Sequence, residues 1–111
     1  MSSIKLVQND TGPSIQVTLF DEETGLPIDV SNAGDVIKMY FQKYGDVDPK
    51  ATLTGTKPNG GSDGLVQFDW ASGDLDESGE FEGEIEITFA SGKTQTMYEK
   101  LSFLVREEIG P

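Results

Sequence analysis

The sequence predicts an all-β fold in which seven to eight short strands form two packed antiparallel sheets. The strongest signal is the run 81–89, where apolar or small residues occupy every odd position and polar residues occupy every even one. This period of two indicates a half-buried strand, because successive strand side chains point to opposite faces. Runs 14–20 and 65–70 alternate in the same way, and turn residues separate the runs at intervals typical of a sandwich.

The first half of the chain reads as strands separated by polar turns. Residues 36–43 carry sizeable side chains on both faces, which favours a central strand over a short helix. Residues 26–30 form a short extended piece, where Pro27 indicates an edge position because it has no backbone N–H to donate. The strands expected before residue 60 span 4–6, 14–19, 36–43 and 51–56.

The second half continues the pattern. Residues 57–64 contain proline and three glycines and predict the most flexible loop. A short turn over residues 90–93 predicts an antiparallel hairpin. The apolar positions after residue 100 appear in the opposite parity to those before it, so we expect a bulge or break. The remaining strands are expected at 65–70, 81–89, 94–98 and 101–105, within one domain over residues 1–111 whose tail, 106–111, is flexible.

Composition excludes several classes of function. The chain of 111 residues contains no cysteine, and so neither disulfides nor cysteine zinc sites. Acidic residues number 20 against 8 basic ones, a formal charge of −12, which disfavours binding to nucleic acid or to anionic membranes. No segment resembles a signal peptide or is long and apolar enough to span a bilayer, so we expect a soluble product.

The acidic residues do not form an evident catalytic pair. Glu80, Glu82, Glu84 and Glu86 share one solvent face at strand spacing, so we expect them to be ionised and equivalent. Acid–base catalysis by two carboxylates needs different environments for the two groups. The chain also has no histidine to activate a serine or threonine. We therefore expect no enzymatic activity, no catalytic residues and no cofactor.

Two further candidates for binding chemistry have simpler structural explanations. Asp46 and Asp48 form one acidic cluster and residues 74–77 form another, but neither has the spacing of a helix-loop-helix calcium site. Aspartate is common in turns because it accepts hydrogen bonds from nearby backbone amides. Trp70 could stack on a sugar if exposed, but it shares an alternating face with Val66 and Phe68, which favours the core. We expect no metal site.

Two resemblances give the fold a more specific form. Residues 76–81, Asp-Glu-Ser-Gly-Glu-Phe, resemble the corner that opens the penultimate strand of immunoglobulin-like domains, with Phe81 in place of the tyrosine. A broader resemblance covers about 90 residues. The segments 9–15, 21–30, 66–76 and 79–96 are similar, in that order, to small immunoglobulin-like structural proteins of tailed bacteriophages, the type that includes the N-terminal domain of the baseplate upper protein.

This resemblance implies an immunoglobulin-like antiparallel β-sandwich without a disulfide and a role as a non-enzymatic virion protein. The expected partners are other phage structural proteins of the capsid, neck, tail or baseplate. We expect many copies of the chain on a symmetric particle, each made in the host cytoplasm before assembly into the virion. The loop 57–64 and the N-terminal strand are the expected docking surfaces. The alternative is a carbohydrate-binding or adhesin-type module that could depend on calcium.

The acidic face predicts how stability depends on salt. Like charges on neighbouring positions of one strand face repel each other, and dissolved ions screen that repulsion. We expect the melting temperature to rise as sodium chloride is added, as measured by differential scanning calorimetry. A melting temperature that falls in moderate salt contradicts this and indicates that the carboxylates are paired.

Overall fold

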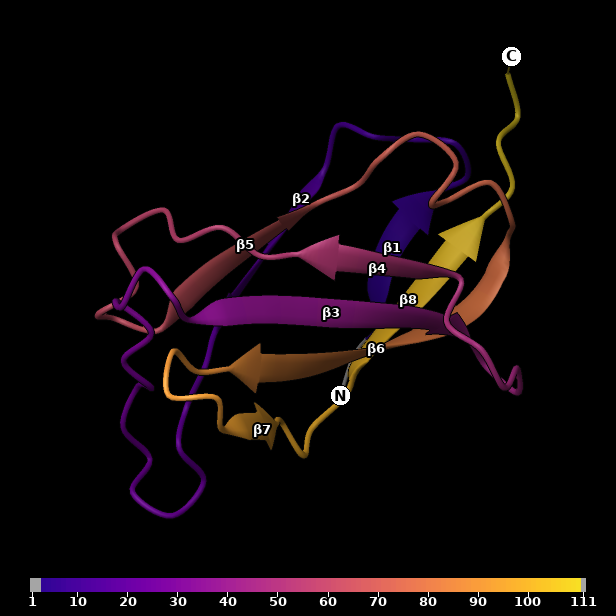
Figure 1. Ribbon diagram of the computed structural model, residues 1–111. Coiled ribbons are helices and arrows are strands. Elements are labelled where there is room, and N and C mark those ends of the chain that lie inside the picture. Colours follow the sequence, from indigo (N-terminus) through magenta and orange to yellow (C-terminus); the bar gives the residue numbers. More distant parts are fainter. Residues whose placement is uncertain (1–2, 111) are drawn as a thin grey trace.

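The computed structural model describes residues 3–110 and confirms the all-β prediction (Figure 1). Strands and turns make up this range, and none of it is helical. The eight strands are β1 (Ile4–Val7), β2 (Ser14–Thr18), β3 (Val36–Lys43), β4 (Ala51–Thr54), β5 (Leu65–Asp69), β6 (Gly79–Thr88), β7 (Thr94–Thr96) and β8 (Leu101–Arg106).

The strands form two sheets of unequal size. The larger sheet has the order β1-β8-β6-β3-β4, with β7 also paired to β6, and the smaller sheet contains β2 and β5. The pairs are antiparallel except for β1 and β8, which run parallel with Ile4 opposite Phe103 and point the same way in Figure 1. The prediction of purely antiparallel sheets is wrong here. A parallel pair needs a long connection, and these two strands have the rest of the domain between them.

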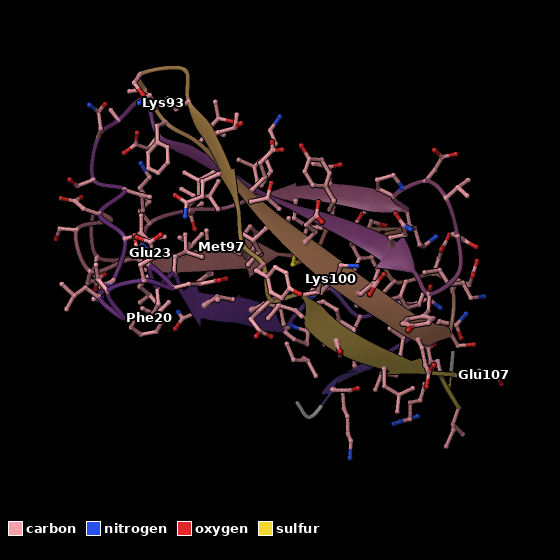
Figure 2. All side chains as sticks on the ribbon, turned by 90° about the horizontal axis from the view of Figure 1, so that it is seen from below. Phe20, Glu23, Lys93, Met97, Lys100 and Glu107 are labelled. Carbon is pink, nitrogen blue, oxygen red and sulfur yellow. The ribbon has the colours of Figure 1, made fainter. Side chains whose placement is uncertain are left out.

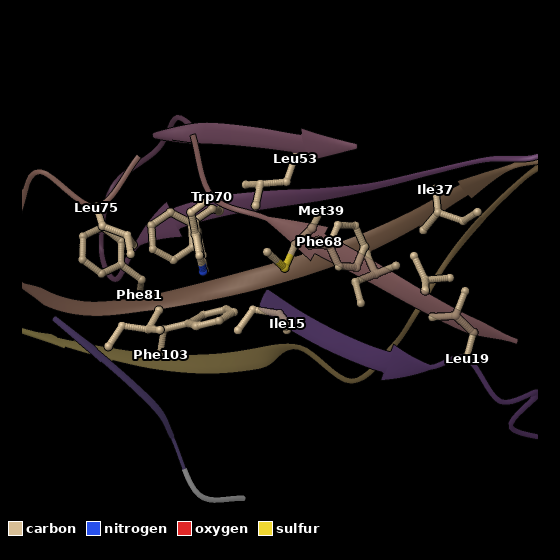
Figure 3. Close-up of a cluster of buried hydrophobic side chains, with 14 of the residues drawn as sticks. Ile15, Leu19, Ile37, Met39, Leu53, Phe68, Trp70, Leu75, Phe81 and Phe103 are labelled. Carbon is tan, nitrogen blue, oxygen red and sulfur yellow. The ribbon is translucent and has the colours of Figure 1, made fainter. Parts of the chain in front are cut away.

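The core lies between the sheets and is centred on the ring of Phe41. This ring stacks on Phe81 with centroids 4.6 Å apart, and it meets Trp70 and Phe103 edge-on at 4.9 and 5.3 Å. Figure 3 shows Trp70, Phe81 and Phe103 among the buried side chains. Trp70 is 5% exposed, so its predicted place in the core is confirmed. Its indole Nε1 has no hydrogen-bond partner among the described residues.

Strand β6 sorts its residues as the alternation predicted. Phe81, Ile85 and Ile87 are buried, and Phe89 packs against the core just after the strand. Gly83 also faces inward, where a β-carbon would lie 2.8 Å from the sulfur of Met39 and 2.9 Å from a ring carbon of Phe103. A glycine at this position therefore lets the larger side chains of two neighbouring strands close over β6.

The predicted hairpin and break after β6 are both present. β7 pairs antiparallel with β6, and the amide of Phe89 donates to Lys93 O at 2.8 Å across the turn. Between the pairs Glu86↔Thr96 and Gly83↔Leu101 the register moves by two residues.

The predicted change of parity at this break is wrong. Odd-numbered positions face inward on both sides of the break: Met97 before it and Leu101 after it pack against the core. Thr94 and Thr96, at even-numbered positions, are exposed. Two extra residues preserve the inward face, because side chains alternate with a period of two.

The short extended piece predicted at residues 26–30 does not form a strand of its own. A single bridge joins Phe20 to Pro27, and the amide of Ile28 donates to Leu19 O at 2.8 Å. Pro27 lacks the N–H that a longer ladder needs. Val30, at the end of this segment, is fully buried and donates its amide to Gly61 O at 2.9 Å.

The loop 57–64, predicted to be the most flexible stretch, is tied to the body of the domain by backbone contacts. Gly61 and Gly64 have positive φ, and β-carbons there would lie 2.6 Å from Val30 O and 2.8 Å from Leu19 O. Glycine thus allows this loop to approach other backbone closely.

The predicted flexible tail is anchored in part. Arg106 belongs to β8, and the amide of Glu108 donates to the side-chain oxygen of Gln8 at 3.4 Å. Ile109 is 96% exposed, and Pro111 lies outside the described residues.

The two faces of β6 predict opposite costs of substitution. Ile87→Ala removes a side chain with no exposed surface, so we expect the free energy of unfolding to fall by about 2–5 kcal/mol. Glu84→Ala, on the exposed face of the same strand, should change it by no more than about 0.5 kcal/mol. Urea denaturation of both variants measures the contrast. Equal effects would show that the faces are assigned wrongly.

Candidate functional site

Three of the carboxylates considered for calcium have structural partners. Asp74 accepts a hydrogen bond from the amide of Ala71 at 2.8 Å. Asp76 forms an ion pair with Lys50, and Glu77 lies 2.5 Å from the ammonium of Lys43. Within residues 3–110 no three acidic side chains are grouped closely enough to hold a metal ion.

The ion pair at Lys43 ties the corner before β6 to the end of β3. The hydrogen bond to Glu77 raises the pKa of Lys43, because it favours the charged ammonium. Phe81 stacks on Phe41 at the start of β6. The corner over residues 76–81 is therefore held by ring packing and ion pairs, whereas the similar corner of immunoglobulin-like domains uses a tyrosine hydroxyl.

The four glutamates on the outer face of β6 are not equivalent, contrary to the prediction. Glu86 accepts a hydrogen bond from the hydroxyl of Tyr40 at 3.2 Å, and Glu82 lies 3.6 Å from the ammonium of Lys100. Glu80 and Glu84 are exposed. Desolvation, followed by the bond to Glu86, raises the pKa of Tyr40.

A polar hollow lies on this outer face, and we call it the outer groove. It has a volume of about 260 Å³ and combines an aromatic ring with amide, carboxylate and ammonium groups, a set that suits hydrogen bonding to a polar ligand. The register of β3 with β6 places Tyr40 opposite Glu84 and Gln42 opposite Glu82. The outer groove is lined by Tyr40, Gln42, Pro49, Glu82, Glu84 and Lys100.

A second, mainly apolar hollow runs beside β2, and we call it the edge groove. It has a volume of about 310 Å³ and lies between β2 with its following residues and the break that separates β7 from β8. The side chain of Ile85 on β6 contributes to its floor. The edge groove is lined by Val17, Thr18, Leu19, Phe20, Glu22, Ile85, Met97, Glu99 and Leu101.

The edge groove continues into a neighbouring hollow of about 360 Å³ that shares Phe20, Glu22 and Met97 and adds Asp21 and Glu23. Figure 2 shows Phe20, Glu23 and Met97 close together at one end of the molecule. We call Asp21, Glu22, Glu23 and Glu99 the acidic rim. Phe20 is 51% exposed and Tyr98 is 83% exposed.

Sequence reasoning missed the edge groove, although one signal pointed toward it. A break before residue 101 was expected from the sequence, and residues at this break line the groove. The sequence did not show that the break lies beside β2. Its lining comes from three separate parts of the chain, so no local pattern could assemble it.

The docking surfaces expected from the sequence lie elsewhere. In the loop 57–64, the side-chain amide of Asn59 donates to the carboxylate of Asp63 at 2.9 Å, and the ammonium of Lys57 donates to Asn32 O at 2.8 Å. β1 is an edge strand of the larger sheet. A shallow hollow of about 330 Å³ beside it is lined by Lys5, Leu6, Val7, Leu104 and Arg106.

No protein-family model matches the chain, and no curated protein is significantly similar to it. No helix that could cross a membrane occurs among residues 3–110.

The carboxylate of Asp63 predicts a pH-dependent contribution to stability. The hydrogen bond from Asn59, followed by that from the amide of Leu65, lowers the pKa of Asp63 below its usual 3.8. A lowered pKa in the folded state adds stability above the unfolded value, and that stability is lost as the pH falls through the folded value.

We therefore expect Asp63→Ala to lower the melting temperature near neutral pH, and the deficit to shrink as the pH falls below about 3.8. Asp48→Ala is the matched control, because the carboxylate of Asp48 makes no hydrogen bond or ion pair to the described residues. Calorimetry across the acidic range measures both variants. A deficit for Asp63→Ala that stays constant with pH would contradict the assignment.

Proposed function

We propose that the chain is a non-enzymatic structural protein of a tailed-phage virion, an immunoglobulin-like module that attaches by protein–protein contacts. The order of the strands supports the immunoglobulin-like assignment. In such domains strands C, F and G are neighbours in one sheet, while B and E are neighbours in the other. The neighbours β3, β6 and β8 and the pair β2 and β5 follow the same pattern along the chain. The sequence resemblance to phage structural proteins supports the virion role.

The edge groove is the observation that carries the protein-binding role. Apolar hollows rimmed by polar residues mark interaction sites on proteins. Phe20 and Tyr98 stand exposed around this one, on a chain whose charge of −12 otherwise favours contact with water. A symmetric particle would hold many copies, so weak individual contacts can add up through avidity.

The outer groove favours glycan recognition as a second candidate. Tyr40, Gln42 and Glu84 present a ring and hydrogen-bonding groups side by side, as sugar-binding sites do. Trp70 is buried and does not contribute a stacking platform. Tyr40→Ala should abolish binding to a glycan array if this candidate is right, and should leave attachment to particles intact if the virion role is right.

The virion role predicts the composition of purified particles. Mass spectrometry of gradient-purified phage that encodes this chain should find it at a fixed ratio to the major structural proteins, because a symmetric assembly offers repeated sites. A high-salt wash controls for adsorbed protein. Absence of the chain from mature particles would refute the proposal.

A further inference from the structure

The outward edge of β2 has no neighbouring strand. The smaller sheet contains β2 and β5 alone, and a bridge between Thr56 and Gln67 continues the β5 side toward β4. Nothing in residues 3–110 pairs with the other side of β2. Such an edge offers a row of backbone donors and acceptors to an incoming chain.

The register identifies which backbone groups face this open edge. Gln67 exchanges both of its backbone hydrogen bonds with Thr56, and Gln16 is opposite Gln67. Leu19 donates to Gly64 O at 2.9 Å, on the β5 side. Because bonding directions alternate along an antiparallel strand, the N–H and C=O groups of Gln16 and Thr18 point to the open edge.

The edge groove lies along this same edge. Val17, Thr18 and Leu19 form one wall, and Met97 and Leu101 belong to the other. This second wall lies where the register with β6 moves by two residues, between Thr96 and Leu101. A strand added to β2 would therefore turn every second side chain into the edge groove and the others to the outer face of the smaller sheet.

The charge of the acidic rim favours an added strand that carries basic residues. Glu22 and Glu99 line the edge groove, and Asp21 and Glu23 line the hollow that continues it. Lys100 directly follows Glu99 of the rim, but its ammonium lies 3.6 Å from Glu82. Long basic side chains on the outer face of such a segment can extend to the opposite charge of the rim, which favours association.

A second copy of the chain fits this site poorly. It would bring a second acidic rim and another formal charge of −12, and its own β2 has no basic residue. Like charges brought together in an interface are costly. The occupant favoured by charge is a different protein.

We infer that the edge groove is a strand-addition site. An extended segment of a partner protein, apolar at alternate positions and basic between them, pairs with the open edge of β2 and inserts its apolar side chains into the groove. This inference rests on the proposed function as a protein-binding module and names the kind of segment that the module receives.

The test uses the full chain and a short synthetic peptide in which valine and lysine alternate. We expect saturable binding by fluorescence anisotropy, and hydrogen-exchange NMR should show new protection at the amides of Gln16 and Thr18. A peptide with glutamate in place of lysine should bind at least about tenfold more weakly. A peptide with N-methyl groups on one edge, which cannot pair with β2, should lose binding while leaving the protein unchanged.

Protein variants separate groove-specific binding from general attraction. Glu22→Lys combined with Glu99→Lys should weaken binding at least about tenfold, while the matched control, Asp48→Lys combined with Glu107→Lys, should weaken it far less. Thr18→Pro should abolish binding with the far-ultraviolet circular dichroism spectrum retained, because proline is tolerated where the N–H faces outward on an edge strand.

Three results would overturn the inference. The first is equal weakening by the two charge-reversed pairs, which indicates non-specific attraction. The second is undiminished binding of the N-methylated peptide. The third is concentration-dependent dimerisation with Gln16 and Thr18 already protected, which assigns the groove to a second copy. The proposed function fails separately, through absence of the chain from particles, and particles that retain the Thr18→Pro variant would refute strand addition alone.

Discussion

The packing of Phe41 is the contact on which the two-sheet architecture depends. Its ring lies within 4.6–5.3 Å of three other aromatic rings. Phe81 and Phe103 belong to the larger sheet, whereas Trp70 directly follows β5 of the smaller one. Edge-to-face and stacked pairs stabilise beyond the area they bury. Because the smaller sheet has two strands, this cluster fixes its position over the larger sheet, and the open edge of β2 depends on that position.

The edge groove and the acidic rim are both related to the small size of the two-stranded sheet. A third strand beside β2 would satisfy its outward backbone groups and cover Met97 and Leu101. Without such a strand in the described part of the chain, apolar side chains remain accessible next to an unpaired edge. Edges of this kind promote aggregation, and charged residues beside them oppose it by repelling identical copies. The acidic rim thus protects the groove from self-association while leaving it open to a partner of opposite charge.

Local patterns were enough to predict most strands and their buried faces. Alternation over 81–89 correctly separated Ile85 and Ile87 from the glutamates, and the shared face of Val66, Phe68 and Trp70 correctly placed the tryptophan in the core. These predictions succeeded because burial on one sheet face imposes a period of two on the sequence itself.

What the sequence did not reveal depends on contacts between distant segments. The parallel pairing of β1 with β8 and the meeting of Tyr40 with Glu86 follow from register and topology. The glycines of the loop 57–64 predicted flexibility, but the sequence did not show that they allow close backbone contact with Val30 and Leu19. Both candidate grooves belong to this non-local class, whereas Asp74 serves a turn and Glu77 an ion pair.

The parallel pairing of β1 with β8 has a mechanical consequence. The pairs run from Ile4↔Phe103 to Val7↔Arg106, so the chain enters the pair at the start of one strand and leaves it at the end of the other. A force that pulls these two points apart slides the strands lengthwise and loads their hydrogen bonds together. A force on the β6–β7 hairpin, by contrast, opens its bonds one after another from the end. A domain held at both ends in a larger assembly would therefore resist stretching through the shear strength of its first and last strands.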